Sequence, residues 1–151
     1  MKTAFLSLAL SLVLAPCVIA APNDGRQFIV GPRAADRAPL PFSDGVLVDN
    51  TFYISGHLGL DPKTGQPAAD APTEVKLVMD AVEKTVKSAG LSMNDVTSLT
   101  VYCTDLELYD TFNAEYRKYF PDHFPARAFI GVAKLLRGAH FEVQGIAVKP
   151  H

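Results

Sequence analysis

The first hydrophobic blocks beyond the N-terminal segment are short and are separated by polar turns. Residues 46–48 and 51–55 flank the polar pair Asp49-Asn50, a pattern that predicts a β-hairpin with a tight turn. Residues 27–30 are a further strand candidate. Residues 57–71 are rich in Gly, Pro and Asp, so we expect a loop there with a turn at residues 61–65.

A helical period follows this loop and predicts a helix over residues 73–89. Its apolar positions recur at i, i+3, i+4 spacing and are Val75, Val78, Met79, Val82 and Val86. Thr73 and Lys76 form only a partial capping box at the start, and Gly90 is expected to end the helix.

The second half of the chain predicts a strand, a helix and two closing strands. Residues 96–103 alternate enough to form a strand, and residues 106–120 carry an aromatic stripe that predicts a second helix ended by Pro121. Apolar residues then fill two segments, 125–132 and 138–148, which we expect to be the last strands.

This order of elements predicts an α+β fold, with one sheet and two helices on one face. Two helices cover only one face, so the other must be solvated or buried against another subunit. Residues 129–132 are apolar on both alternations, which favours burial between subunits.

The N-terminus resembles a secretory signal, since Lys2 precedes a short apolar run and small residues at 18–20 suit cleavage before Ala21. An uncleaved anchor and a lipoprotein attached at Cys17 are alternatives, but Pro16 interrupts the run and precedes the cysteine. The expected division is therefore a signal peptide over residues 1–20 and one domain over 21–151. The mature protein is expected in the periplasm or secreted, with no membrane span.

Charge and cysteine content narrow the function classes. The net charge is −2, and loss of Lys2 makes it −3, which argues against nucleic acid as the main partner. Loss of Cys17 leaves Cys103 alone, as a small core residue rather than a nucleophile. The four histidines lack metal-ligand spacing, so we expect neither a metal nor another cofactor.

Two charges interrupt the closing strands and are the candidate functional residues. Arg127 stands at the start of one strand and Glu142 lies within the other. A charge among apolar residues is costly unless it is paired or functional, and the arginine fork suits a carboxylate ligand. The alternatives are a structural ion pair, which these two residues could form with each other, and a paired interface role for Glu142.

Six short motifs occur in the order found in the reactive-intermediate deaminase (RidA/YjgF) family, and the chain resembles that family over essentially all of its mature domain. They are Pro41-Phe42-Ser43-Asp44-Gly45, Phe52-Tyr53-Ile54-Ser55-Gly56-His57-Leu58, Asp61-Pro62-Lys63-Thr64-Gly65, Val101-Tyr102-Cys103-Thr104-Asp105, Phe112-Asn113-Ala114-Glu115-Tyr116 with Tyr119-Phe120, and Pro125-Ala126-Arg127 with residues 142–148.

The resemblance implies a homotrimer with a chorismate-mutase-like fold and clefts between subunits. It implies hydrolysis of 2-imino acids, and their enamine tautomers, to 2-oxo acids and ammonia. Arg127 would hold the substrate carboxylate, and Glu142 would position or deprotonate the attacking water. Ser55 and Gly56 would line the cleft. A non-catalytic binder of small carboxylates, or a holdase-like protein, is the alternative.

The chain departs from the family pattern at three cleft positions. Phe42 replaces a tyrosine, which removes a hydroxyl that could contact substrate or water. Phe129 replaces a small residue near the arginine and is expected to narrow the pocket. His57 replaces a glutamine, and we expect it in a loop or at the cleft edge rather than in catalysis.

Overall fold

The computed structural model describes residues 25–31 and 40–150, and the expected signal peptide and cleavage site lie outside them. Six strands form one sheet in the order β1-β2-β3-β6-β4-β5, in which only β4 and β5 run parallel. The strands are β1 (Arg26–Ile29), β2 (Gly45–Val48), β3 (Thr51–Leu58), β4 (Val96–Cys103), β5 (Ala126–Gly131) and β6 (Phe141–Val148).

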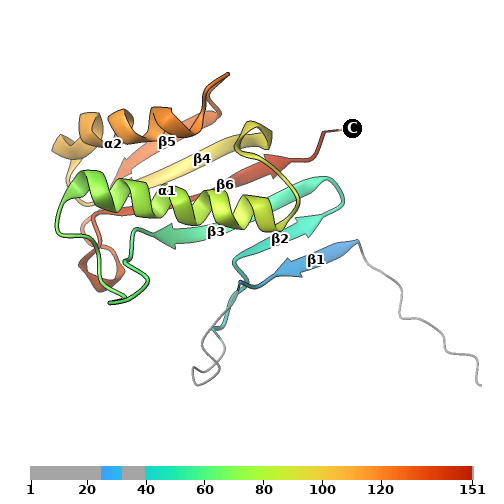
Figure 1. Ribbon diagram of the computed structural model, residues 1–151, viewed down its shortest axis with the longest axis horizontal. Helices are drawn as coiled ribbons and strands as arrows, with labels where there is room; N and C mark the ends of the chain where they lie inside the picture. The colour runs from blue at the N-terminus through green and yellow to red at the C-terminus, as the bar shows by residue number, and fades with distance from the viewer. Residues whose placement is uncertain (1–24, 32–39, 151) are drawn as a thin grey trace, which may run out of the picture.

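Helices α1 (Ala71–Ser88) and α2 (Tyr109–Tyr116) lie side by side on one face of this sheet (Figure 1). The predicted α+β fold, a single sheet with two helices on one face, is therefore confirmed.

The hairpin of β2 and β3 is confirmed, but β3 is longer than predicted. It continues to Leu58, so His57 belongs to a strand and not to a loop. β3 pairs with β6, and the register shifts so that Ser55 and Gly56 both oppose Gln144. This β-bulge was not predicted from the sequence; it realigns the strand and brings Gly56 beneath the side chain of Glu142.

Helix α1 begins two residues earlier than predicted because Asp70, not Thr73, is its N-cap. The Asp70 side chain accepts a hydrogen bond of 2.9 Å from the backbone N–H of Thr73, which satisfies a donor that the first turn leaves open. Pro72 fits in the first turn because backbone N–H groups there have no acceptor within the helix, so a nitrogen without a hydrogen loses no helical hydrogen bond. The predicted end near Gly90 is correct, since the helix ends at Ser88 and Gly90 adopts a φ of 74°.

The second predicted helix, residues 106–120, is not one continuous α-helix. A 3₁₀ turn, η2 (Leu106–Leu108), precedes α2, and another, η3 (Arg117–Tyr119), follows it. The Asp105 side chain accepts from the N–H of Glu107 at 3.0 Å and starts the first turn. In short helical elements, tight 3₁₀ turns provide hydrogen bonds to the backbone groups at the helix ends. Pro121 then prevents the helical segment from continuing.

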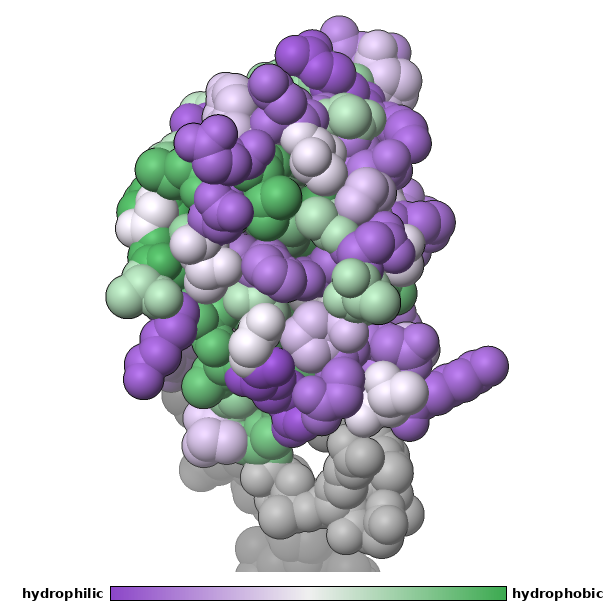
Figure 2. Space-filling view, turned by 90° about the vertical axis from the view of Figure 1, so that its left-hand side faces the viewer, coloured by the Kyte–Doolittle hydropathy of each residue, from purple (hydrophilic) through white to green (hydrophobic). Residues whose placement is uncertain are grey.

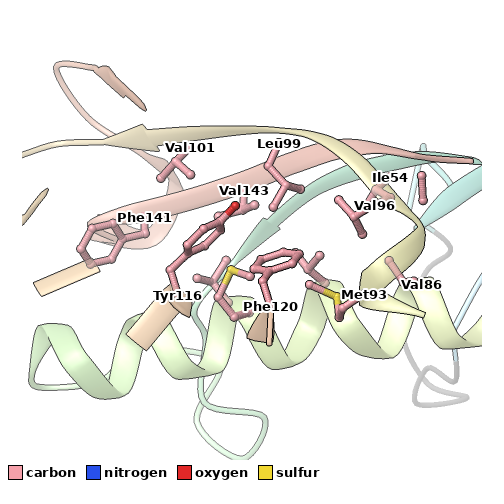
Figure 3. Packing of buried hydrophobic residues seen from close by; sticks show 14 of the residues in the cluster. Ile54, Val86, Met93, Val96, Leu99, Val101, Tyr116, Phe120, Phe141 and Val143 are labelled. Atoms are coloured by element: carbon pink, nitrogen blue, oxygen red, sulfur yellow. The ribbon is translucent and has the colours of Figure 1, made fainter. Parts of the chain in front are cut away.

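The core lies between the helices and the sheet (Figure 3). Its largest fully buried aromatic residues are Phe52, Phe112 and Phe141. Cys103 is fully buried, and its thiol lies 3.0 Å from the Asp105 carbonyl oxygen, to which it donates. Burial raises the pKa of this thiol, so the expected role as a small core residue is confirmed.

One charge is fully buried in this core. Glu74, in the first turn of α1, accepts hydrogen bonds from the backbone N–H groups of His140 (2.6 Å) and Phe141 (3.0 Å). Its second oxygen lies 2.8 Å from Nδ1 of His140. The carboxylate thus joins α1 to the start of β6, one residue before Glu142.

The sheet face opposite the helices is not covered by any described element and carries exposed apolar side chains, among them Tyr53, Ile130 and Val148. Figure 2 shows hydrophobic residues gathered toward this side and hydrophilic residues toward the helix side. Exposed apolar area of this kind is typical of an interaction surface. Within residues 25–31 and 40–150, no helix has the length and apolar character needed to cross a membrane.

Candidate functional site

Arg127 points toward the helices, because it pairs in register with Leu99, a core residue of β4. Its guanidinium lies among four aromatic rings. The Cζ atom is 4.5 Å from the ring centre of Tyr116 and 5.7–5.8 Å from those of Tyr109, Phe112 and Phe129. Aromatic faces attract a cation and offset part of the cost of removing it from water.

One neutral side chain orients this guanidinium. Nη2 of Arg127 donates a hydrogen bond of 2.8 Å to Oδ1 of Asn113, which lies on α2. Nη1 of the same residue is buried and has no hydrogen-bond partner in the part of the chain that the structure describes. A buried charged donor without an acceptor is costly. The arrangement is suited to an anionic ligand that accepts from Nη1.

A cavity of about 260 Å³ adjoins Arg127. The residues that line it are Asn113, Tyr116, Arg117, Phe124, Pro125 and Arg127. Burial raises the pKa of Tyr116 to about 12, so this ring stays neutral beside the cation. Its hydroxyl is directed toward the sheet (Figure 3). The cavity therefore combines aromatic walls with positive charge, as a small organic anion requires.

Glu142 lies in a different environment, on the sheet face opposite the helices. Its register partners are Leu58 on β3 and Tyr102 on β4, and its neighbours Phe141 and Val143 point into the core. Among the described residues, no donor forms a hydrogen bond to its carboxylate.

Glycine at position 56 leaves room for this carboxylate, which a larger residue would displace. A Cβ added at Gly56 would overlap Oε1 of Glu142. The bulge thus provides the space in which Glu142 rests, and both residues belong to one local group.

Ser55 and Phe42 lie near this group. The Ser55 hydroxyl donates to the Ser43 carbonyl at 2.6 Å, and the Ser55 N–H donates to the Asp44 carbonyl at 3.1 Å. These bonds attach the segment around residues 42–44 to the bulge, and Phe42 beside them is exposed.

The predicted site residues thus form two groups that do not meet within one protomer. Arg127 and Phe129 lie on the helix side of β5, whereas Glu142 and Gly56 lie on the opposite face of the sheet. An ion pair between Arg127 and Glu142 in the same chain, left open by the sequence, is therefore wrong. A single site containing both residues requires two copies of the chain.

Phe129 packs beside Arg127 and is not one of the residues that line the cavity. Its ring is 5.0 Å from that of Tyr109 and 5.5 Å from that of Phe112, both in edge-to-face geometry. It thereby forms part of the aromatic surround of the guanidinium. Contact between Phe129 and a substrate stays a prediction.

His57 faces a separate hollow of about 230 Å³ beside α1, which Asp44 and Lys84 also line. Its Nε2 atom is buried and makes no hydrogen bond to the described residues. Burial lowers the pKa of His57, and the Asp44 carboxylate opposes this effect only in part. His57 is therefore a neutral, half-buried strand residue and not a loop residue, and its place at the edge of a cleft stays a prediction.

No metal centre is evident in the described parts of the chain, since His, Cys, Asp and Glu side chains do not gather there in groups of three or more. Sequence reasoning missed the roles of Asn113, Arg117 and Phe124 around Arg127. The available signal was the polar Asn113 within the aromatic stripe of α2, because such a residue needs a buried partner.

Comparisons with known proteins agree with this fold. Residues 33–149 match the family model described as Endoribonuclease L-PSP. The 2-iminobutanoate/2-iminopropanoate deaminase of Bos taurus is 40% identical over 123 residues, which cover 80% of this chain and 89% of that protein.

Solved structures give the same result. The YjgF gene product of Escherichia coli has a TM-score of 0.73 and 32% identity, covering 82% of this chain and 99% of that one. E. coli TdcF with bound serine has a TM-score of 0.74 and 31% identity, covering 82% of this chain and all (100%) of that one.

Proposed function

The chain belongs to the RidA/YjgF family, and from this premise we propose that it is an enzyme that hydrolyses 2-imino acids and their enamine tautomers to 2-oxo acids and ammonia. The relatives named as deaminases of such imines support this activity. The observation that carries it to this chain is the buried, unpartnered Nη1 of Arg127 beside a small cavity.

Arg127 binds the substrate carboxylate. Nη1 donates to one carboxylate oxygen while Asn113 keeps Nη2 fixed, so the cation need not reorganise when substrate enters. The imine carbon is already electrophilic, and the aromatic walls exclude bulk water. Orientation and desolvation are therefore the main contributions of the protein to the rate.

Glu142 of a neighbouring subunit positions the attacking water. It accepts a proton from that water as the oxygen bonds to the imine carbon, which gives a carbinolamine. Starting from the protonated imine, it returns this proton to the carbinolamine nitrogen, and it then takes the hydroxyl proton as the C=O bond forms and the C–N bond breaks. The products are the 2-oxo acid and ammonia, which leaves as ammonium with that last proton. A carboxylate that forms no hydrogen bond within the described chain is free to accept from water in this way.

The site is proposed to lie between subunits of a homotrimer. The two groups of site residues lie on opposite faces of one sheet, and the uncovered face carries exposed apolar side chains. Association that buries this face brings the Glu142 group of one subunit toward the Arg127 group of the next. Phe42, Ser55 and Gly56 would then line the cleft with Phe129. The partners are a small 2-imino or 2-oxo acid and two further copies of the chain.

We also propose that the protein is exported. The family match begins at residue 33, so the signal-like segment over residues 1–20 lies outside it. Intact-mass measurement of protein from the periplasm or medium should give a chain of Ala21 to His151. Protein that keeps residues 1–20 and stays in the cytoplasm would contradict export.

The activity is tested with imines generated in place by an amino-acid oxidase. The measured quantity is the rate of 2-oxo acid and ammonia formation above uncatalysed hydrolysis. We expect Arg127→Ala to lose about 30-fold or more in kcat/KM, since a buried charge-assisted contact is worth about 2–5 kcal/mol. Arg127→Lys should recover little, because lysine lacks the fork. Glu142→Gln should lower kcat and leave carboxylate binding intact.

Arg137→Ala is the matched control, because the Arg137 side chain is exposed and, among the described residues, donates only to the Gly65 carbonyl at 3.3 Å. Wild-type activity in Arg127→Ala would contradict the proposed function. Tight carboxylate binding through Arg127 with no turnover on any imine would replace it with a non-catalytic binder.

A further inference from the structure

The cavity beside Arg127 contains a second cation, Arg117, which the proposed reaction does not use. Arg117 is the first residue of η3, directly after α2, and lines the same cavity as Arg127. It follows Asn113 by four residues, so both side chains lie on the same side of this helical segment.

Nearby acidic residues do not neutralise Arg117. Within the described chain its side chain interacts with Phe124 alone, and its Cζ lies 5.7 Å from the centre of that ring. Glu115 pairs with Lys118 at 2.7 Å, and Asp122 accepts from Asn94 at 2.8 Å. The cavity lining contains two arginines and no carboxylate.

Aromatic rings separate the two cations. Phe124 stacks on Tyr116 with ring centres 6.1 Å apart and planes at 20°, and Tyr116 in turn contacts the guanidinium of Arg127. A ligand that fits such a wall has a short hydrocarbon segment between two anionic groups. The volume of about 260 Å³ is near the lower end of ligand pockets, which suits a small acid.

We propose that Arg117 is a specificity-determining residue that receives an acidic group on the substrate side chain. The preferred substrates are then 2-imino acids with a second carboxylate. This inference rests on the proposed function, since the 2-carboxylate of the same molecule occupies Arg127. Because Arg117 is exposed, water screens its charge, and we expect a preference of only about two- to fivefold.

A matched pair of substrates tests this preference. The imines derived from glutamate and glutamine have nearly the same shape and differ in side-chain charge. We expect kcat/KM to favour the glutamate imine by about fivefold, and Arg117→Gln to remove the preference while leaving the glutamine imine within about twofold of wild type. Raising salt from about 50 mM to about 500 mM should shrink the preference in the wild type.

Lys118→Gln is the control variant, because Lys118 is the adjacent cation at the same helix end and does not line the cavity. It should keep the preference. A cation at a helix C-terminus also stabilises the helix, so both variants are compared for trimer mass by light scattering.

Binding of product analogues separates this inference from the proposed function. Calorimetry with 2-oxoglutarate and 2-oxopentanoate should show tighter binding of the dicarboxylate, dependent on Arg117, even in a preparation without turnover. Equal affinities, a preference that survives Arg117→Gln, or equal losses on both substrates would overturn the role of Arg117. Turnover of the glutamine imine in such a case would leave the proposed function intact.

Discussion

At the scale of single residues, the arginine at the edge of the sheet is held by a neutral partner. Asn113 accepts one hydrogen bond from Arg127 at 2.8 Å and places no negative charge beside it. An aspartate there would also orient the guanidinium but would satisfy its charge. The amide therefore keeps the cation oriented and still available to an anion.

We predict that Asn113→Ala lowers kcat/KM by about 10-fold or more, because a hydrogen bond to a charged group contributes about 1.5–3 kcal/mol. Asn113→Asp should raise KM further than alanine does, since its carboxylate competes with substrate for Arg127. Steady-state kinetics on one imine measure both effects.

Asn94→Ala serves as the comparison, because the Asn94 side chain donates a hydrogen bond to Asp122 at an exposed position and does not line the cavity. A wild-type KM in Asn113→Asp would show that substrate binding does not depend on an uncompensated charge on Arg127.

His57 gives a second residue-scale prediction, on stability against pH. Burial lowers its pKa in the folded protein, whereas the unfolded chain takes up a proton near the ordinary value of about 6.5. Below that pH the unfolded state binds more protons, so the free energy of unfolding falls as the pH falls. Urea unfolding between about pH 8 and pH 5 should show this loss.

His57→Gln should reduce the loss below about pH 6.5, because glutamine does not titrate. Identical pH dependence in the two proteins would mean that His57 is protonated equally in the folded and unfolded states.

At the scale of elements, the sequence predicted the strands and α1 well and their junctions poorly. The apolar positions of α1 follow the helical period because one face is buried, and that period is visible locally. The bulge at Ser55 and Gly56 depends on β6, which lies about ninety residues away along the chain. Likewise Glu74 appears in the sequence as an ordinary first-turn acid, since its partners at His140 and Phe141 become adjacent only on folding.

For the candidate site too, the sequence predicted some residues and missed others. Arg127 and Glu142 were recognisable because charges in apolar strands are rare. Arg117 was not, because exposed helical positions carry polar residues without any function, and the signal at Asn113 was a single polar residue within an aromatic stripe. That Arg127 and Glu142 lie on opposite faces follows only from the strand register.

The hydrogen bonds that join Glu74 of α1 to the start of β6 lead to a prediction about stability. Glu74→Ala leaves the part-buried N–H of His140 and the buried N–H of Phe141 without their acceptor, and we expect a loss of about 3 kcal/mol in the free energy of unfolding. Urea titration of the purified protein measures it.

Glu83→Ala, which removes an exposed i, i+4 pair with Lys87, should cost less than about 0.5 kcal/mol. A similar small cost at Glu74 would mean that the loop before β6 rearranges to satisfy its own donors.

At the scale of the whole molecule, one sheet presents the two groups of candidate site residues on opposite faces. The helices cover the face that holds Arg127, while the face that holds Glu142 remains open and apolar in the described chain. A closed cyclic assembly lets each copy supply Arg127 to one cleft and Glu142 to another. In the proposed homotrimer the catalytic unit is the interface, and no protomer has a complete site alone.

Mixing two inactive variants tests this central claim most directly. Arg127→Ala and Glu142→Gln are each expected to form inactive or nearly inactive trimers. When the two chains are co-expressed with different tags and assemble at random, about a quarter of the clefts combine an intact Arg127 with an intact Glu142 from its neighbour. We therefore predict that mixed trimers regain about a quarter of the wild-type activity per subunit. Mixed trimers with no more activity than the two parent variants would contradict a site shared between subunits.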